Sequence, residues 1–322
     1  MSSRSITQLL TLSAVLVVAA NGQLPPPRAH ASMAYDPASR RVVLAGGSSD
    51  GQNFGDTWGW DGVRWSQLAI PALPRTSHAL VFDAARGAVT MVGGADLAPP
   101  PAESFWGSGL FRLGPAGWLP EHRDSLPPRL KASVAYDPRR KRIVVFGGSV
   151  DNQPSRETWE FDGRHWRLMT ATGPVARSGA VMAYHAATGK LVLFGGGDAA
   201  GDDLRDTWTW DGREWRLVDT IGPSGGRGGA AMAADEARHE LLLVGGVSNH
   251  FTRLERSTWG WTGRRWEARD TLGPSARVVP AMTYDVSRKV VVLFGGRAAG
   301  RRDLNDTWEW DGRRWRDVTP KQ

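Results

Sequence analysis

Short apolar runs separated by turn-forming residues recur along the chain after residue 27. In one representative stretch, apolar residues dominate 132–136 and 142–146, and an alternating apolar and polar pattern covers 158–161, followed by a further short run at 165–168. An Asp-Pro pair lies between the first two runs, and an Asp-Gly pair lies between the last two. Runs of four or five residues bounded by such turns predict four short antiparallel strands joined by hairpins.

This pattern occurs six times. Each copy opens with an arginine and closes its second predicted strand with a Gly-Gly pair 18 residues later. The opening arginines are Arg28, Arg75, Arg129, Arg177, Arg227 and Arg277. The copies begin 47, 54, 48, 50 and 50 residues apart, at about 28–74, 75–128, 129–176, 177–226, 227–276 and 277–319. Repeats of this length and strand content predict an all-β fold, a single six-bladed β-propeller over 23–322 with four antiparallel strands per blade.

The repeats resemble the kelch repeat, which combines a Gly-Gly pair after the second strand with an aromatic residue on the third and Trp on the fourth. Trp pairs lie seven residues apart in five copies, at 58/65, 159/166, 208/215, 259/266 and 308/315. The resemblance covers about 28–319 and implies that these rings, and the tyrosines at one shared position, pack between blades. It also implies a binding platform, although a minority of kelch proteins are enzymes, such as radical copper oxidases and sialic-acid mutarotases.

Residues 1–22 lie outside the repeats. One early arginine, an apolar run over 9–20 and small residues up to Gly22 predict a secretory signal peptide cleaved after Gly22. Twelve apolar residues are too few to span a bilayer. We therefore expect a secreted or periplasmic protein without a transmembrane segment in the mature chain, the alternative being an uncleaved anchor.

Composition narrows the chemistry. The formal net charge is +7, and Arg outnumbers Lys 35 to 5. Because we expect the protein to be exported, we do not expect this positive charge to bind nucleic acid. The chain has no Cys, and its seven His show no metal-ligand spacing. The copper oxidase of the kelch family needs a Cys cross-linked to Tyr, so that activity is not expected here. We expect neither a cofactor nor a metal, and no catalytic residue stands out.

The strand order places the variable loops on one side of the propeller. In an antiparallel meander, the connections between strands 2 and 3 and between strands 4 and 1 share one side, which we call the loop face; the 1–2 and 3–4 turns share the other, the turn face. The second copy carries an insertion at 98–109 on the loop face, and its Phe105 and Trp106 fall outside the repeat pattern. These aromatics either contact a ligand or plug the channel mouth.

The opening arginines are the next candidates. Six guanidinium groups on the loop face could form an anion site, or each could bond loop carbonyls and the acid that precedes the third-strand Trp. His78 stands three residues after its arginine, where the family often has His and the other copies have Ala or Pro. His250 also lies on this face. The turn face is rich in arginine, which predicts either a solvated rim or an attraction to anionic surfaces.

Together these features favour a non-catalytic, monomeric scaffold that binds a protein or glycan through the loop face. One alternative is a sugar-active enzyme such as a mutarotase-like isomerase, and another is a structural component of the envelope. The sequence leaves open whether the ring closes by packing the first blade on the sixth or by exchanging a strand between the termini.

Overall fold

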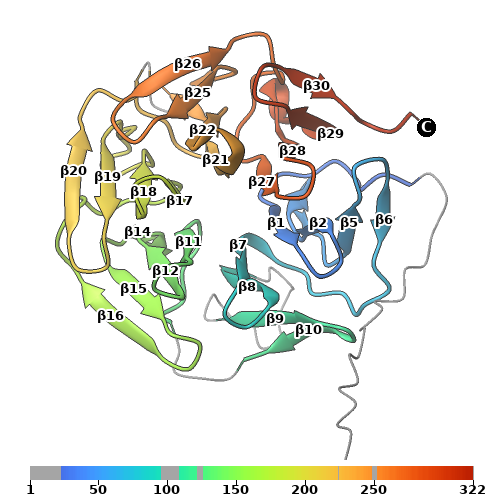
Figure 1. Cartoon of the computed structure of the whole chain (residues 1–322), viewed down its shortest axis with the longest axis horizontal. Coiled ribbons are helices and arrows are strands. Elements are labelled where there is room, and N and C mark those ends of the chain that lie inside the picture. The colour runs from blue at the N-terminus through green and yellow to red at the C-terminus, as the bar shows by residue number, and fades with distance from the viewer. Residues whose placement is uncertain (1–22, 96–108, 122–125, 224, 249–251, 322) are drawn as a thin grey trace, which may run out of the picture.

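Six four-stranded antiparallel sheets are arranged around a central axis in the computed structural model, which describes residues 23–95, 109–121, 126–223, 225–248 and 252–321 (Figure 1). The predicted all-β, six-bladed propeller is confirmed. Helical structure in the described ranges is confined to two single 3-10 turns, η1 (Glu236–Arg238) and η2 (Ala299–Arg301).

Each blade is built from one copy of the repeat, with its first strand beside the axis and its fourth at the perimeter (Figure 1). The first three blades consist of β1 (Ser32–Asp36), β2 (Arg41–Ala45), β5 (Thr57–Trp60) and β6 (Trp65–Gln67); β7 (Thr76–Asp83), β8 (Ala88–Ala95), β9 (Leu110–Gly114) and β10 (Gly117–Pro120); and β11 (Ser133–Asp137), β12 (Arg142–Phe146), β15 (Thr158–Phe161) and β16 (Trp166–Thr170). The last three consist of β17 (Val181–His185), β18 (Lys190–Phe194), β19 (Thr207–Trp210) and β20 (Trp215–Asp219); β21 (Ala231–Asp235), β22 (Glu240–Val244), β25 (Thr258–Trp261) and β26 (Trp266–Asp270); and β27 (Ala281–Asp285), β28 (Val290–Arg297), β29 (Asp303–Trp310) and β30 (Trp315–Asp317).

The turn chemistry explains the short connection between the third and fourth strands. In the third blade, Oδ1 of Asp162 accepts hydrogen bonds from the backbone N–H groups of Arg164 and His165, both at 2.8 Å. Gly163 adopts a φ of 93°, which only glycine reaches without strain. In the second blade, which lacks Asp-Gly, the turn between β9 and β10 is instead bounded by the paired residues Gly114 and Gly117.

The sequence pattern missed small hairpins in the 2–3 connections. β3 (Ser48–Ser49) pairs with β4 (Gln52–Asn53), and equivalent pairs join β13 (Ser149–Val150) to β14 (Gln153–Pro154) and β23 (Val247–Ser248) to β24 (Arg253–Leu254). Two-residue strands carry too little periodic pattern to be recognised from sequence. These hairpins stiffen the loop face.

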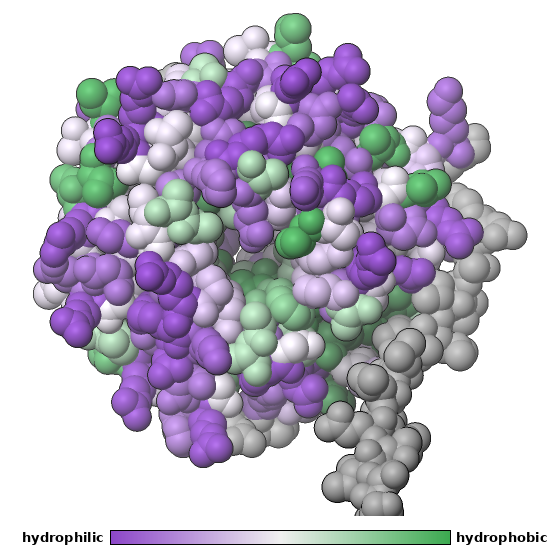
Figure 2. Space-filling view, in the orientation of Figure 1, coloured by the Kyte–Doolittle hydropathy of each residue, from purple (hydrophilic) through white to green (hydrophobic). Residues whose placement is uncertain are grey.

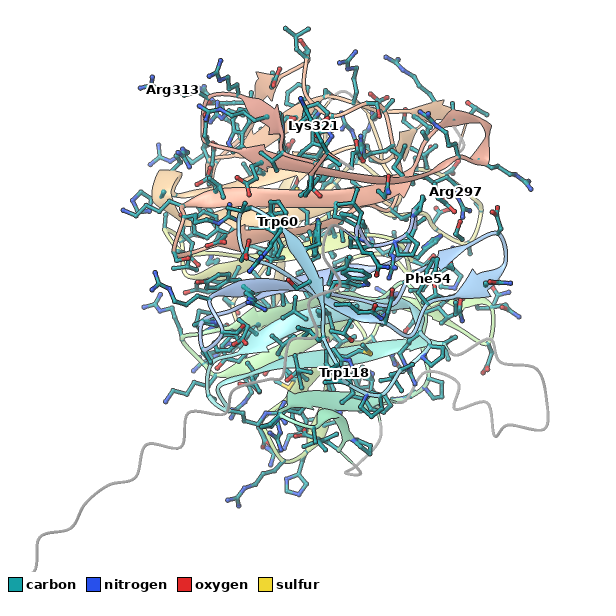
Figure 3. The ribbon with its side chains drawn as sticks, turned by 90° about the vertical axis from the view of Figure 1, so that its right-hand side faces the viewer. Phe54, Trp60, Trp118, Arg297, Arg313 and Lys321 are labelled. Carbon is teal, nitrogen blue, oxygen red and sulfur yellow. The ribbon has the colours of Figure 1, made fainter. Side chains whose placement is uncertain are left out.

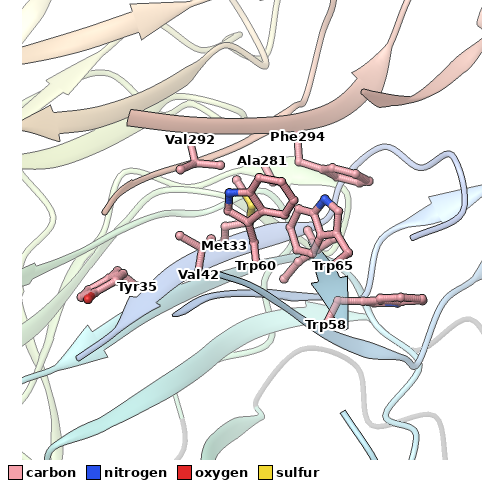
Figure 4. Close-up of a cluster of buried hydrophobic side chains, with 10 residues drawn as sticks. Met33, Tyr35, Val42, Trp58, Trp60, Trp65, Ala281, Val292 and Phe294 are labelled. Atoms are coloured by element: carbon pink, nitrogen blue, oxygen red, sulfur yellow. The ribbon is translucent and has the colours of Figure 1, made fainter. Parts of the chain in front are cut away.

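Within the described residues, the ring closes by packing, without strand exchange. All strands of the first blade come from the first copy, and all strands of the sixth come from the last. Between them, Trp60 and Trp65 pack against Val292 and Phe294, as Figure 4 shows. The ring centroids of Trp65 and Phe294 are 5.1 Å apart in an edge-on arrangement. The structure thus selects one of the two closure modes that the sequence left open.

The two sides of the propeller differ as the strand order predicts. Viewed from the side, Arg313 of a 3–4 turn lies at one end of the blades, whereas Phe54 of a 2–3 connection and Arg297 at the end of β28 lie at the other (Figure 3). Figure 2 looks onto the turn face, where hydrophilic residues dominate around a central hollow. The loop face therefore lies on the far side of that view.

Candidate functional site at the channel mouth

The opening arginines are buried, and this corrects their candidacy as a ligand-binding ring. The relative exposure of these six residues is 0–2%. Their Nη1 atoms donate hydrogen bonds to the carbonyl of the first Gly of the pair 18 residues on, at 2.8–3.2 Å. An arginine held in this way joins the start of a blade to the end of its second strand and presents no surface to a ligand.

Most of these arginines also bind the acid before the third-strand Trp. Arg177, for example, contacts both carboxylate oxygens of Asp206 at 2.6 and 2.9 Å, and Oδ2 of Asp206 accepts a hydrogen bond from Nε1 of Trp208 at 2.6 Å. Burial alone would raise the pKa of Asp206, but the hydrogen bonds and charge of Arg177 outweigh it, and the pKa lies below its usual value. The same three partners recur as Arg28, Asp56 and Trp58; Arg129, Glu157 and Trp159; and Arg277, Asp306 and Trp308.

The fifth blade departs from this arrangement. Ser257 replaces the acid, and its Oγ accepts hydrogen bonds from Nη2 of Arg227 at 3.0 Å and Nε1 of Trp259 at 3.1 Å. Burial lowers the pKa of Arg227 to about 10, and the charge of Glu255 opposes part of that lowering. The position before the third-strand Trp is therefore a structural joint that holds the buried arginine and the Trp, and a hydroxyl group can replace the carboxylate there.

A closed ring of backbone hydrogen bonds surrounds the channel two residues after each opening arginine. Each N–H in this ring donates to the carbonyl of the equivalent residue in the preceding blade, at 2.6–3.3 Å, and the first blade donates to the sixth. All six residues have φ between 49° and 67°. We call them the mouth ring: His30, Ser77, Lys131, Gly179, Gly229 and Val279.

The mouth ring lines a cavity of about 350 Å³ at the channel opening on the loop face. Ala31, Ala132, Ala180, Ala230 and Pro280 form part of its wall. Small side chains one position after five of the six ring residues leave this space open, and His78 occupies that position in the second blade. The cavity combines apolar walls with a few polar groups, which is the usual character of a ligand site.

The mouth ring breaks the sixfold symmetry of the frame. Blades one to three contribute His30, Ser77 and Lys131, which we call the polar arc. Blades four to six contribute Gly179, Gly229 and Val279, which we call the apolar arc. A ligand in this cavity meets hydrogen-bonding groups on one side and apolar or bare backbone on the other.

Two cationic side chains from different blades, Lys131 and Arg297, act on His30. Burial, followed by the charges of Lys131 and Arg297, lowers the pKa of His30 to about 4, with Asp303 opposing. Arg297 binds Asp303 through two hydrogen bonds, at 2.7 and 3.1 Å. The side chain of Lys131 is exposed and makes no hydrogen bond or ion pair within the described part of the chain. At neutral pH the imidazole is thus uncharged, and Lys131 is the cation available to an anionic group.

His78 also lines the cavity, as a buried side chain with 8% exposure. Burial, and then the charge of Arg75, lowers its pKa to about 3. The Ala45 carbonyl opposes part of this lowering, but neither ring nitrogen has hydrogen-bond geometry with a described group. The repeat offers no shared role for this imidazole, because the other copies have Ala or Pro there.

Three sequence candidates cannot be placed. Phe105, Trp106 and His250, together with nearly all of the 98–109 insertion and the proposed signal 1–22, lie outside the described residues. Sequence reasoning overlooked the mouth ring, although a signal was present. The residue type at the mouth-ring position differs in almost every copy, whereas the residue two positions earlier is always arginine.

The turn face contains both solvated and paired arginines. Arg64 and Arg265 have side chains 69% and 78% exposed. In contrast, Arg140 binds Asp137 and Glu160, and Glu160 accepts a hydrogen bond at 2.9 Å from Nε1 of Trp210 in the next blade. Part of the predicted rim therefore connects blades.

Within the described ranges, no group of three His, Asp or Glu side chains is arranged to hold a metal ion. The same ranges contain no helix long and apolar enough to cross a membrane.

Comparison with known proteins supports the fold alone. The solved structure titled "Structure of YjhT" matches with a TM-score of 0.72 and 13% sequence identity, over 92% of this chain and 99% of that one. No family model matches the sequence, and no curated protein matches it. The chain is a six-bladed β-propeller, and its resemblance to kelch repeats stays a prediction.

Proposed function

We propose that this chain is a secreted or periplasmic, non-catalytic binding protein that recognises a protein or glycan through its loop face, with the channel mouth as the contact site. The observation that carries the proposal is the mouth ring. An otherwise repetitive frame presents a different side chain from most blades at this position, and these residues line the cavity. Variable groups on a rigid scaffold are where binding is expected.

Backbone conformation adds support. A β-branched residue at positive φ is an outlier, because its Cβ crowds the neighbouring carbonyl. Val279 has a φ of 49° and is the sole β-branched residue among the described non-glycine residues with positive φ. Glycine, which occupies the same position in blades four and five, would avoid a cost of about 1 kcal/mol or more. Outside the mouth ring, the described non-glycine residues with positive φ lie in exposed turns, so the valine is the informative case.

A direct test uses the immobilised protein to capture its partner from the native envelope fraction. Lys131→Gly and Val279→Gly should reduce capture of a reproducible partner, because each removes a mouth side chain from a backbone that suits glycine. Arg64→Ala on the turn face is the matched control and should capture normally. Undiminished capture by both mouth variants, with loss in the turn-face variant, would reject the proposal.

A sugar isomerase is the second candidate, and the cluster of His30, Arg297 and Asp303 favours it. An imidazole held neutral beside an ion pair can exchange a proton with a bound acidic sugar. Interconversion of N-acetylneuraminate anomers, followed by NMR, tests this activity. A rate above the uncatalysed rate that falls in His30→Gly would replace the binding proposal with the enzymatic one.

A further inference from the structure

The two arcs of the mouth ring make different demands on an occupant. The backbone N–H groups of Gly179, Gly229 and Val279 are all engaged by the preceding blade, at 2.9, 2.9 and 2.6 Å. The apolar arc therefore offers no free backbone donor, and Val278 and Pro280 extend its apolar surface. Sugar hydroxyls placed there would lose hydrogen bonds to water, whereas an aliphatic side chain would gain from leaving water.

Charges around the cavity determine where an anionic group of the occupant would lie, on the side opposite the apolar arc. Lys131 is exposed on the polar arc, beside the hydroxyl-bearing Ser77. Arg297 is partly neutralised by its two hydrogen bonds to Asp303. Among the described residues of the wall, the one carboxylate is that of Asp198, which accepts hydrogen bonds from the backbone N–H groups of Ala200 and Asp202 in its own loop, both at 2.9 Å. An anionic group is therefore best placed against Lys131.

We infer that the occupant is the C-terminus of a protein chain, with its terminal carboxylate on Lys131 and Ser77 and an aliphatic last side chain against Val279. This inference rests on the proposed function and deepens it, because it selects a protein over a glycan. A C-terminal residue carries its charge and its apolar group on the same carbon, which matches a cavity of about 350 Å³ with a polar and an apolar side. The hydroxyl groups of a sugar surround the whole edge of its ring, so some of them would face the apolar arc and lose hydrogen bonds to water.

Calorimetry with the full chain tests this inference with defined probes. Acetylated Ala-Ala-Ala-Leu with a free carboxylate should bind at least tenfold more tightly than the same peptide ending in an amide. Lys131→Gly should abolish that difference, and Lys131→Arg should retain most of it. Val279→Gly should reduce the preference for a terminal Leu over a terminal Gly. The thermal unfolding midpoint of each variant confirms that it is folded.

Equal binding of the acid and the amide would overturn the inference, as would binding of galacturonate without binding of either peptide. If Lys131→Gly abolished this galacturonate binding, the channel mouth would still be the binding site, and the proposed function would survive. If no probe bound and Lys131→Gly left partner capture unchanged, both the inference and the proposed function would be rejected.

Discussion

Nε1 of Trp65 in the first blade donates a hydrogen bond of 2.9 Å to Oγ1 of Thr307 in the sixth, joining residues 242 positions apart. The same contact links Trp215 to Thr158, Trp266 to Thr207 and Trp315 to Thr258, at 2.8–2.9 Å. The junction that closes the ring is therefore chemically the same as junctions within the chain. This equivalence explains how packing can close the propeller without an exchanged strand.

Thr307→Val is expected to lower the free energy of unfolding by about 1–3 kcal/mol, because it leaves the buried indole N–H of Trp65 without an acceptor. Thr258→Val removes the same contact inside the chain and should cost a similar amount. Urea denaturation of both variants measures the difference. An unchanged midpoint for Thr307→Val, beside a clear loss for Thr258→Val, would mean that the closing contact does not contribute.

Asp206→Asn should destabilise the protein by about 3 kcal/mol, because Arg177, whose side chain is fully buried, would lose its countercharge. The fifth blade provides the reverse experiment. Ser257→Asp places an acid beside Arg227 and should stabilise the fold by about 1 kcal/mol. Thermal unfolding tests both directions, and a Ser257→Asp variant less stable than the parent would contradict the proposed joint.

His78 should make the fold sensitive to moderate acid. Its folded-state pKa, about 3, lies below the ordinary value of 6.5, so below pH 6.5 the unfolded chain binds a proton that the folded chain excludes. Stability from this group is complete above pH 6.5 and is lost as the pH falls toward 3. His78→Ala, which copies the other blades, should show a smaller loss of unfolding free energy between pH 7.5 and 4.5. Parallel curves for the two proteins would rule out this role.

Val279→Gly should leave stability unchanged or raise it by up to about 1 kcal/mol, because relief of the left-handed strain offsets the entropy of glycine. Val278→Gly, at the neighbouring position outside the positive-φ set, should destabilise the protein. Chemical denaturation compares the two variants. Equal losses would indicate that Val279 is retained for packing and would weaken the functional interpretation of the mouth ring.

Much of the fold could be read from local pattern. Strand periodicity, Asp-Gly turns and the fixed spacing between arginine and Gly-Gly determine four strands per copy, and repetition determines the stacking. The predicted β12 and β15 boundaries match the structure, because their ends are set by turn residues. The first and fourth strands of that blade shift by a residue or two, because pairing with a neighbouring strand extends them.

The site was harder to predict, for a physical reason. Sequence alone established that six arginines are equivalent, but it could not decide whether their side chains face solvent or the interior. Tertiary structure decided this by bringing Gly carbonyls, and in four blades an acid, around a buried guanidinium group. Only the closed ring places residues from six distant segments at one channel mouth. The sequence thus determined the repeating frame, because that frame depends on local pattern, and the tertiary structure determined the cavity, because it depends on contacts between blades.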